Sequence, residues 1–226
     1  MVRFEVLFTI LVKSNSLYYG KVKMITLVNY GLGNIQAFVN IYKRLNITVK
    51  VAQSALDLVG AEKLILPGVG SFDWAMTRLK ASGMGPSLDD MVLNQKCPVL
   101  GVCVGMQMMA RRSDEGDLPG LGWIDAEVKR FDDSLFHQKS RLPHMGWNDV
   151  SPIATDTLFK DLVAPRFYFL HSYYFAAGNS AQVLATTDYN GVFVSSSVVE
   201  HIYGVQFHPE KSHQWGEQLL KNFSEL

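Results

Sequence analysis

The sequence has few cysteines and no excess of either charge. Its 226 residues include two cysteines, and it lacks a C-x-x-C pair, an H-E-x-x-H motif and histidines at metal-ligand spacing. We therefore expect no disulfide, metal or cofactor, and reduced thiols as in a cytoplasmic protein. Basic and acidic side chains balance at 21 each, so nothing favours phosphate binding and we expect no nucleic-acid partner.

The sequence also has no apolar run long enough to span a bilayer. The apolar stretch 2–12 contains Glu5 and is too short, and it lacks the basic start and the cleavage site of a signal peptide. Because the first well-formed strand starts at Met24, we hypothesise that residues 1–23 are an extension and that the working protein begins near Met24. Residues 24–226 are then one cytoplasmic domain without a membrane partner. Finding residues 1–23 by intact-mass analysis of protein from the native host would contradict this hypothesis.

The front half of the chain alternates strand-like and helix-like segments. Strands are predicted at 24–29, 48–52, 63–67 and 98–102, and helices after Asn34, at 72–81 and at 86–94. The back half has successive strand-like segments, followed by a helix at 214–223. These strands are 123–130, 166–171, 182–187, 192–199 and 202–206. We predict an α/β fold with a central, mostly parallel sheet, helices on both faces and antiparallel strands in the C-terminal half.

A cysteine stands in a G-x-C-x-G motif, G-V-C-V-G at 101–105, between a strand and the helix-forming run 106–111. This pattern predicts a tight strand–turn–helix elbow in which both glycines permit close packing and Cys103 is exposed at the turn. A helix N-terminus favours the thiolate. The thiolate would attack an amide carbonyl, and the Val104 N–H would receive the oxyanion. The alternative is a small, inert core cysteine, which is our interpretation of Cys97.

The segment V-Q-F-H-P-E at 205–210 ends the last strand-like run. Pro209 favours an extended His208, and in extended backbone residues two apart point to the same side. His208 and Glu210 can then face one way, with the carboxylate orienting the imidazole and leaving its other nitrogen free as a base. An incidental surface turn is the alternative, but the elbow cysteine favours a catalytic interpretation.

Two further segments are candidates for substrate binding. The residues Gly68, Val69 and Gly70 follow a strand at the carboxyl edge of the sheet, where ligands bind in open α/β folds. Their N–H groups could supply a second oxyanion donor. Gln107 lies one helical turn after Cys103 and could bind the polar end of a substrate. A turn without a ligand and an exposed helix residue remain the respective alternatives.

Two histidines lie outside these segments, in P-H-M-G-W-N at 143–148 and in F-L-H-S-Y-Y at 169–174. For His144 and His171 we favour hydrogen-bonded structural or interface roles over catalysis. Trp147 and Tyr173, from the same segments, are further interface candidates. The aromatic residues around His171 are expected to pack in the core.

Taken together, the chain resembles the glutaminase subunits of imidazole glycerol phosphate synthase, which are class I (triad-type) glutamine amidotransferases. The resemblance runs from about Met24 to the C-terminal helix. It rests on N-Y-G-L-G-N at 29–34, L-P-G-V-G-S-F-D at 66–73, G-V-C-V-G-M-Q at 101–107, G-V-Q-F-H-P-E-K-S at 204–212 and the two histidine segments.

The resemblance implies that Cys103 is the nucleophile, His208 the acid and base, and Glu210 the orienting carboxylate. It also implies that Gly68–Gly70 borders the oxyanion hole and that Gln107 borders the glutamine pocket. Such subunits dock on a (β/α)₈-barrel synthase, form heterodimers with it and pass ammonia to it through an internal passage. Val104 stands where leucine is usual, but the donor there is backbone.

Three alternatives stay open at this point. Similar glutaminase subunits supply ammonia for acetamidino sugars of surface polysaccharides, and their glutaminase motifs are the same. A non-catalytic partner-binding module would have no need of Cys103, His208 and Glu210 together. A stand-alone cysteine hydrolase would act without any partner.

Overall fold

The computed structural model describes residues 24–135 and 142–226, and the extension predicted for residues 1–23 lies outside them. One mixed sheet crosses the molecule in the order β2-β1-β3-β4-β13-β12-β10-β6-β5, with β11 beside β12 and β8 beside β11. A second sheet pairs β7 with β9. None of the helices in the described part of the chain is long and apolar enough to cross a bilayer.

The strands are β1 (Met24–Val28), β2 (Thr48–Ala52), β3 (Lys63–Gly68), β4 (Val99–Cys103), β5 (Arg112–Ser113), β6 (Ala126–Arg130), β7 (His144–Asp149), β8 (Ser151–Pro152), β9 (Arg166–His171), β10 (Tyr173–Ala177), β11 (Val183–Asp188), β12 (Val192–Val199) and β13 (Ile202–Val205). The α-helices are α2 (Ile35–Arg44), α3 (Ala55–Leu58), α4 (Phe72–Ser82), α5 (Gly85–Asp89), α6 (Val104–Met108) and α7 (His213–Glu225).

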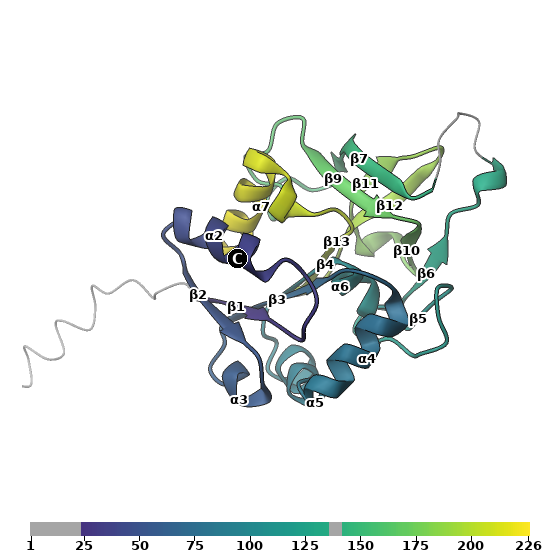
Figure 1. The fold of residues 1–226 in the computed structure, drawn as a ribbon. Helices are drawn as coiled ribbons and strands as arrows, with labels where there is room; N and C mark the ends of the chain where they lie inside the picture. Colours follow the sequence, from purple (N-terminus) through teal and green to yellow (C-terminus); the bar gives the residue numbers. More distant parts are fainter. Residues whose placement is uncertain (1–23, 136–141) are drawn as a thin grey trace, which may run out of the picture.

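The front half forms the parallel part of the sheet, as predicted. β1 pairs with β2 and β3, and β3 pairs with β4, all in parallel. α2 and α7 lie together on one face, while α3, α4 and α5 lie on the other (Figure 1). β4 is buried along its whole length, which explains its unbroken run of apolar and glycine residues.

β13 is the seam between the parallel and antiparallel parts of the sheet. It pairs in parallel with β4 on one side and antiparallel with β12 on the other. In this register Val205 lies beside Val102. The carboxyl ends of β4 and β13 are therefore neighbours, and the turns that follow each strand meet at one edge of the sheet.

The structure differs from the local predictions in the end of one helix and in two strands that were not predicted. The helix expected through Arg111 ends at Met108, because the next amides form tight turns and Arg111 N–H already bonds Ala126 in the sheet. The segment at 144–149 is a strand, β7, paired with β9. Tyr173–Ala177 is also a strand, β10, whose pairing with β6 no local pattern had indicated.

Candidate active site

Cys103 occupies a strained turn between β4 and α6. The residue is buried, so the exposure predicted for it at the turn is wrong. Its φ of 55° and ψ of −114° are unusual for a residue with a side chain, and such conformations cost about 1–3 kcal/mol. The turn is possible because its glycines have no Cβ, and the neighbouring backbone leaves no space for one. One added to Gly105 would lie 1.9 Å from the Leu66 carbonyl oxygen, and one added to Gly101 would lie 2.8 Å from the backbone of α6. The predicted collision at both glycines is thus confirmed.

The contribution of α6 to the thiolate is smaller than expected. The helix has five residues, so few peptide dipoles align behind Cys103. A charged side chain at the elbow has to be stabilised mainly by individual donors from other elements.

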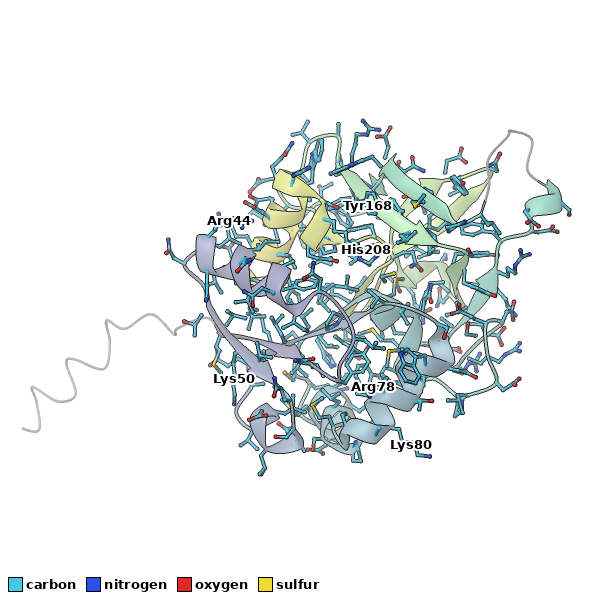
Figure 2. The ribbon with its side chains drawn as sticks, viewed as in Figure 1. Arg44, Lys50, Arg78, Lys80, Tyr168 and His208 are labelled. Carbon is cyan, nitrogen blue, oxygen red and sulfur yellow. The ribbon has the colours of Figure 1, made fainter. Side chains whose placement is uncertain are left out.

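His208 and Glu210 approach the elbow from the turn after β13. His208 is extended, and its backbone N–H donates to the carbonyl oxygen of Tyr168, at 2.9 Å. Glu210 Oε1 lies 2.9 Å from His208 Nδ1, and both side chains are almost fully buried. The Ser212 hydroxyl donates to the His208 carbonyl oxygen, at 2.6 Å, and fixes the turn from behind. Figure 2 shows His208 inside the molecule, close to Tyr168.

The charge on His208 follows from its two neighbours. Burial by itself lowers the pKa of the imidazole, but the Cys103 thiolate and the Glu210 carboxylate outweigh it and raise this pKa to about 10. Hydrogen bonds to both side chains contribute to the rise. The raised pKa keeps His208 protonated near neutral pH, with Nδ1 bound to Glu210 and Nε2 left for the cysteine.

A cavity of about 320 Å³ opens onto this pair. Such a volume lies at the small end of ligand pockets and suits a molecule the size of an amino acid. Its lining consists of Val69, Gly70, Cys103, Val104, Glu115, Pro143, Leu170, His171, Ser172, Tyr173, His208 and Lys211.

The predicted binding residues fall into two groups. Val69, Gly70 and Val104 line the cavity beside Cys103. Gly68 packs behind them, where a Cβ would lie 2.4 Å from the Gly105 nitrogen. Gln107 is buried, not exposed, and its amide nitrogen donates to the Tyr173 carbonyl oxygen at 3.2 Å and to Gln206 Oε1 at 2.9 Å.

The residues predicted as interface candidates differ in their exposure and in their distance from the cavity. His144 and His171 are buried, with His144 Nδ1 3.0 Å from His171 Nε2, so both have the structural, hydrogen-bonded placement that we favoured. His171 and Tyr173 border the cavity. Trp147, on β7, is 39% exposed and stacks on His213 with 5.3 Å between ring centroids.

Two residues of the site did not emerge from the sequence. Glu115 lines the cavity and accepts the Phe72 backbone N–H at 2.8 Å, and burial raises its pKa despite that hydrogen bond. Gln206 is fully buried with Nε2 3.8 Å from Cys103 Sγ. The signal for Gln206 was available, because it precedes His208 by two positions on an extended strand. Glu115 had no such signal, since a loop brings it to the cavity.

Comparisons with known proteins agree with this geometry. The family model described as glutamine amidotransferase class-I matches residues 26–225. The imidazole glycerol phosphate synthase subunit HisH of Bdellovibrio bacteriovorus is 55% identical over 204 residues, 90% of this chain and 100% of that protein. The corresponding HisH subunit of Leptospira borgpetersenii is 46% identical with the same coverage.

A solved structure has the same fold. A crystal structure of a glutamine amidotransferase superposes with a TM-score of 0.69 at 20% identity, covering 89% of this chain and 97% of that one. The fold expected from the sequence is therefore confirmed. The chain belongs to the class I glutamine amidotransferases and, within them, to the HisH subunits of imidazole glycerol phosphate synthase.

Proposed function

We propose that this protein hydrolyses glutamine to glutamate and ammonia, and that a (β/α)₈-barrel synthase uses the ammonia to form imidazole glycerol phosphate and aminoimidazole carboxamide ribotide in histidine biosynthesis. The observation that carries the proposal is the meeting of Cys103, His208 and Glu210 at one small cavity. The 55% identity to a HisH subunit supports the histidine pathway. Both cysteines are free, which suits an enzyme of the reducing cytoplasm.

In the proposed reaction the Cys103 thiolate attacks the side-chain amide carbon of glutamine. The developing oxyanion accepts the Val104 N–H and an N–H from the Gly68–Gly70 segment. The His208 imidazolium gives its Nε2 proton to the leaving nitrogen, so ammonia departs and a γ-glutamyl thioester remains. Neutral His208 then takes a proton from water, the hydroxide attacks the thioester, and glutamate and the Cys103 thiolate are released.

The cavity contains a suitable partner for the amino-acid end of glutamine. Glu115 is the carboxylate of the lining and can bind the α-ammonium group. We expect Glu115→Gln to raise KM for glutamine about tenfold or more and to change kcat much less, because this contact is made equally in the ground and transition states.

We place the docking site of the synthase around the cavity mouth. The exposed fractions of Val69 and Leu170, which line the cavity, are 38% and 39%. Met145 and Trp147, on the neighbouring β7, are exposed by 64% and 39%. Ammonia released beside such an apolar rim would pass into the bound partner and not into water.

Glutamine hydrolysis by the purified protein, alone and with barrel synthases from the same genome, tests the proposal. We expect stimulation by the histidine-pathway synthase, loss of activity in Cys103→Ala, and retained activity in the matched variant Cys97→Ala. Stimulation only by a synthase encoded beside sugar-modifying genes would assign the ammonia to surface-polysaccharide synthesis. Absence of hydrolysis with every partner would contradict the proposal and favour a non-catalytic module.

A further inference from the structure

Gln206 is a buried amide that the triad reaction does not use. It follows β13 directly, and because Val205 lies beside Val102, Gln206 comes next to Cys103. Its backbone N–H donates to the Ser195 carbonyl oxygen at 2.9 Å, so the strand geometry continues through it. Gln206 and His208, two positions apart, therefore point to the same side and reach the same sulfur.

The orientation of the Gln206 amide is fixed by a backbone carbonyl. The Tyr173 carbonyl oxygen can only accept, so the Gln107 atom 3.2 Å away must be the amide nitrogen. That nitrogen lies 2.9 Å from the Gln206 side chain, which must present its oxygen there. The remaining atom, Gln206 Nε2, is then the one that faces Cys103 Sγ at 3.8 Å. Sulfur is larger than oxygen, and this distance suits an N–H···S hydrogen bond.

The same carbonyl also fixes a second branch of the network. His171 Nδ1 lies 2.7 Å from the Tyr173 oxygen and must donate to it, which leaves His171 Nε2 as the acceptor for His144 Nδ1. His144 Nε2 is then free to accept the Asn148 amide N–H, at 3.2 Å. This arrangement needs both rings neutral, and burial lowers the pKa of His144 to about 4 and of His171 to about 3.

We propose that Gln206 is a further residue of the catalytic site, which donates its amide N–H to the Cys103 thiolate, and that Gln107 positions Gln206 for this role. A buried thiolate next to a five-residue helix needs direct donors. His208 supplies one and loses it when it transfers its proton. Gln206 keeps its hydrogen bond throughout, because an amide does not titrate. The inference deepens the proposed glutaminase function and rests on it only for the identity of the reaction.

Other groups that influence the sulfur have to be separated from Gln206. His208 approaches from the turn after β13, and Glu115 and Lys211 border the same cavity. The Tyr30 hydroxyl donates to the Pro67 carbonyl oxygen at 2.7 Å, and burial together with the Cys103 charge raises its pKa, so it stays neutral. His171 is neutral as well. Of these groups His208, Glu115 and Lys211 carry or change charge, and variants of Gln206 leave all three in place.

The pH dependence of Cys103 alkylation by iodoacetamide tests the inference without glutamine or a partner. In a Cys97→Ala background, mass spectrometry follows the single remaining thiol between pH 5 and 10. We expect Gln206→Met, which preserves the side-chain length, to move the half-maximal rate about one unit to higher pH, equivalent to about tenfold less thiolate at a given pH. Gln206→Glu should move it further, since its ionised carboxylate would repel the thiolate.

The matched control is Ser196→Ala. Ser196 is also fully buried in the sheet and donates to the Gly204 carbonyl oxygen at 2.8 Å, but it makes no contact with Cys103. Its alkylation profile should coincide with that of the Cys97→Ala parent. An unchanged profile in both Gln206 variants, or an equal shift in Ser196→Ala, would overturn the inference. Either result leaves the proposed glutaminase function standing, and that function is tested separately by glutamine hydrolysis.

Discussion

The two ends of β4 carry the two cysteines of the sequence in different chemical surroundings. Cys97, just before the strand, has its sulfur 3.6 Å from the Ala61 carbonyl oxygen, and burial raises its pKa to about 11 against a weaker opposing effect of Lys63. Cys103, at the other end, faces His208 and Gln206. Both cysteines are buried residues. The two thiols therefore differ in the side chains that face them and not in their burial.

This difference arises from the direction of the strands. At the carboxyl end of β4 the chain turns sharply into α6, and the neighbouring β13 delivers its own turn to the same place. At the amino end, the hydrogen-bond partners of Cys97 Sγ are the backbone carbonyl oxygens of Ala61 and Pro98. Ligand sites of open α/β sheets lie at the carboxyl ends of strands for this reason.

The largest expected effect is that of removing the Cys103 sulfur, compared with removing the Cys97 sulfur at the other end of β4. Cys103→Ala should reduce glutamine hydrolysis by about 10⁴–10⁶-fold, because the covalent intermediate can no longer form. Cys97→Ala should retain nearly full activity and lose only a small packing contribution. Steady-state hydrolysis by both proteins in the presence of the synthase makes the comparison. Substantial turnover by Cys103→Ala would show that the sulfur at the elbow is not the nucleophile.

Removing the charge behind His208 should have the next largest effect. Glu210→Gln keeps the shape of the side chain but no longer favours the imidazolium, so the pKa of His208 should fall and hydrolysis should drop by up to about 10⁴-fold. A pH–rate profile of kcat/KM checks both changes. A profile identical to that of the parent protein would contradict the orienting role. Glu225→Gln, the same change at the C-terminal end of α7, serves as control.

Crowding at the elbow can be tested with two glycines. Gly105→Ala would place its Cβ 1.9 Å from Leu66 O, so we expect a loss of about 3 kcal/mol in the free energy of unfolding. Gly85→Ala, at the first residue of α5, meets nothing within 4 Å and has no left-handed φ, so it should be neutral or slightly stabilising. Denaturant unfolding measures both. Equal stability of the two variants would mean that the elbow relaxes easily.

The last prediction concerns pH and the histidine pair near the elbow. The pKa values of His144 and His171, about 4 and about 3, lie below the ordinary value of 6.5. At pH values between the folded pKa of each ring and 6.5, the unfolded chain binds more protons than the folded chain. The free energy of unfolding should therefore fall as the pH falls, by up to about 1.4 kcal/mol per unit for each ring.

Urea unfolding at several pH values between 6.5 and 4 measures this slope. His171→Gln removes one titrating ring and should reduce the slope by up to half. His208 does not contribute in this range, because its pKa is raised and the stability linked to it is lost only as the pH rises towards 10. A slope unchanged by His171→Gln would show that the rings are already accessible to protons in the folded state.

Much of this site was predictable because its residues lie close together in the sequence. The elbow at 101–105 is a local turn, and its glycines, its cysteine and the Val104 N–H follow from five consecutive residues. His208 and Glu210 are likewise related by the spacing of one extended segment. The parallel half of the sheet was predicted for a similar reason, since buried strands and amphipathic helices alternate there with a clear period.

Residues whose role depends on distant neighbours were harder to predict. Gln107, on α6, is half of a pair whose other member, Gln206, follows β13. Glu115 reaches the cavity from the turn after β5, and no pattern in that turn indicates it. β7 and β10 were not predicted either, because their pairing with β9 and β6 outweighs weak local preferences.

The sequence by itself determined the chemical groups of the site, which are a cysteine at a glycine-flanked elbow and a histidine two positions before a carboxylate. It also determined the alternation of strands and helices in the front half. These properties depend on steric limits within a few neighbouring residues. The tertiary structure alone decided how the side-chain amides are oriented around Cys103. This orientation depends on the parallel register of β4 and β13. The register brings together side chains that lie about a hundred residues apart in the chain.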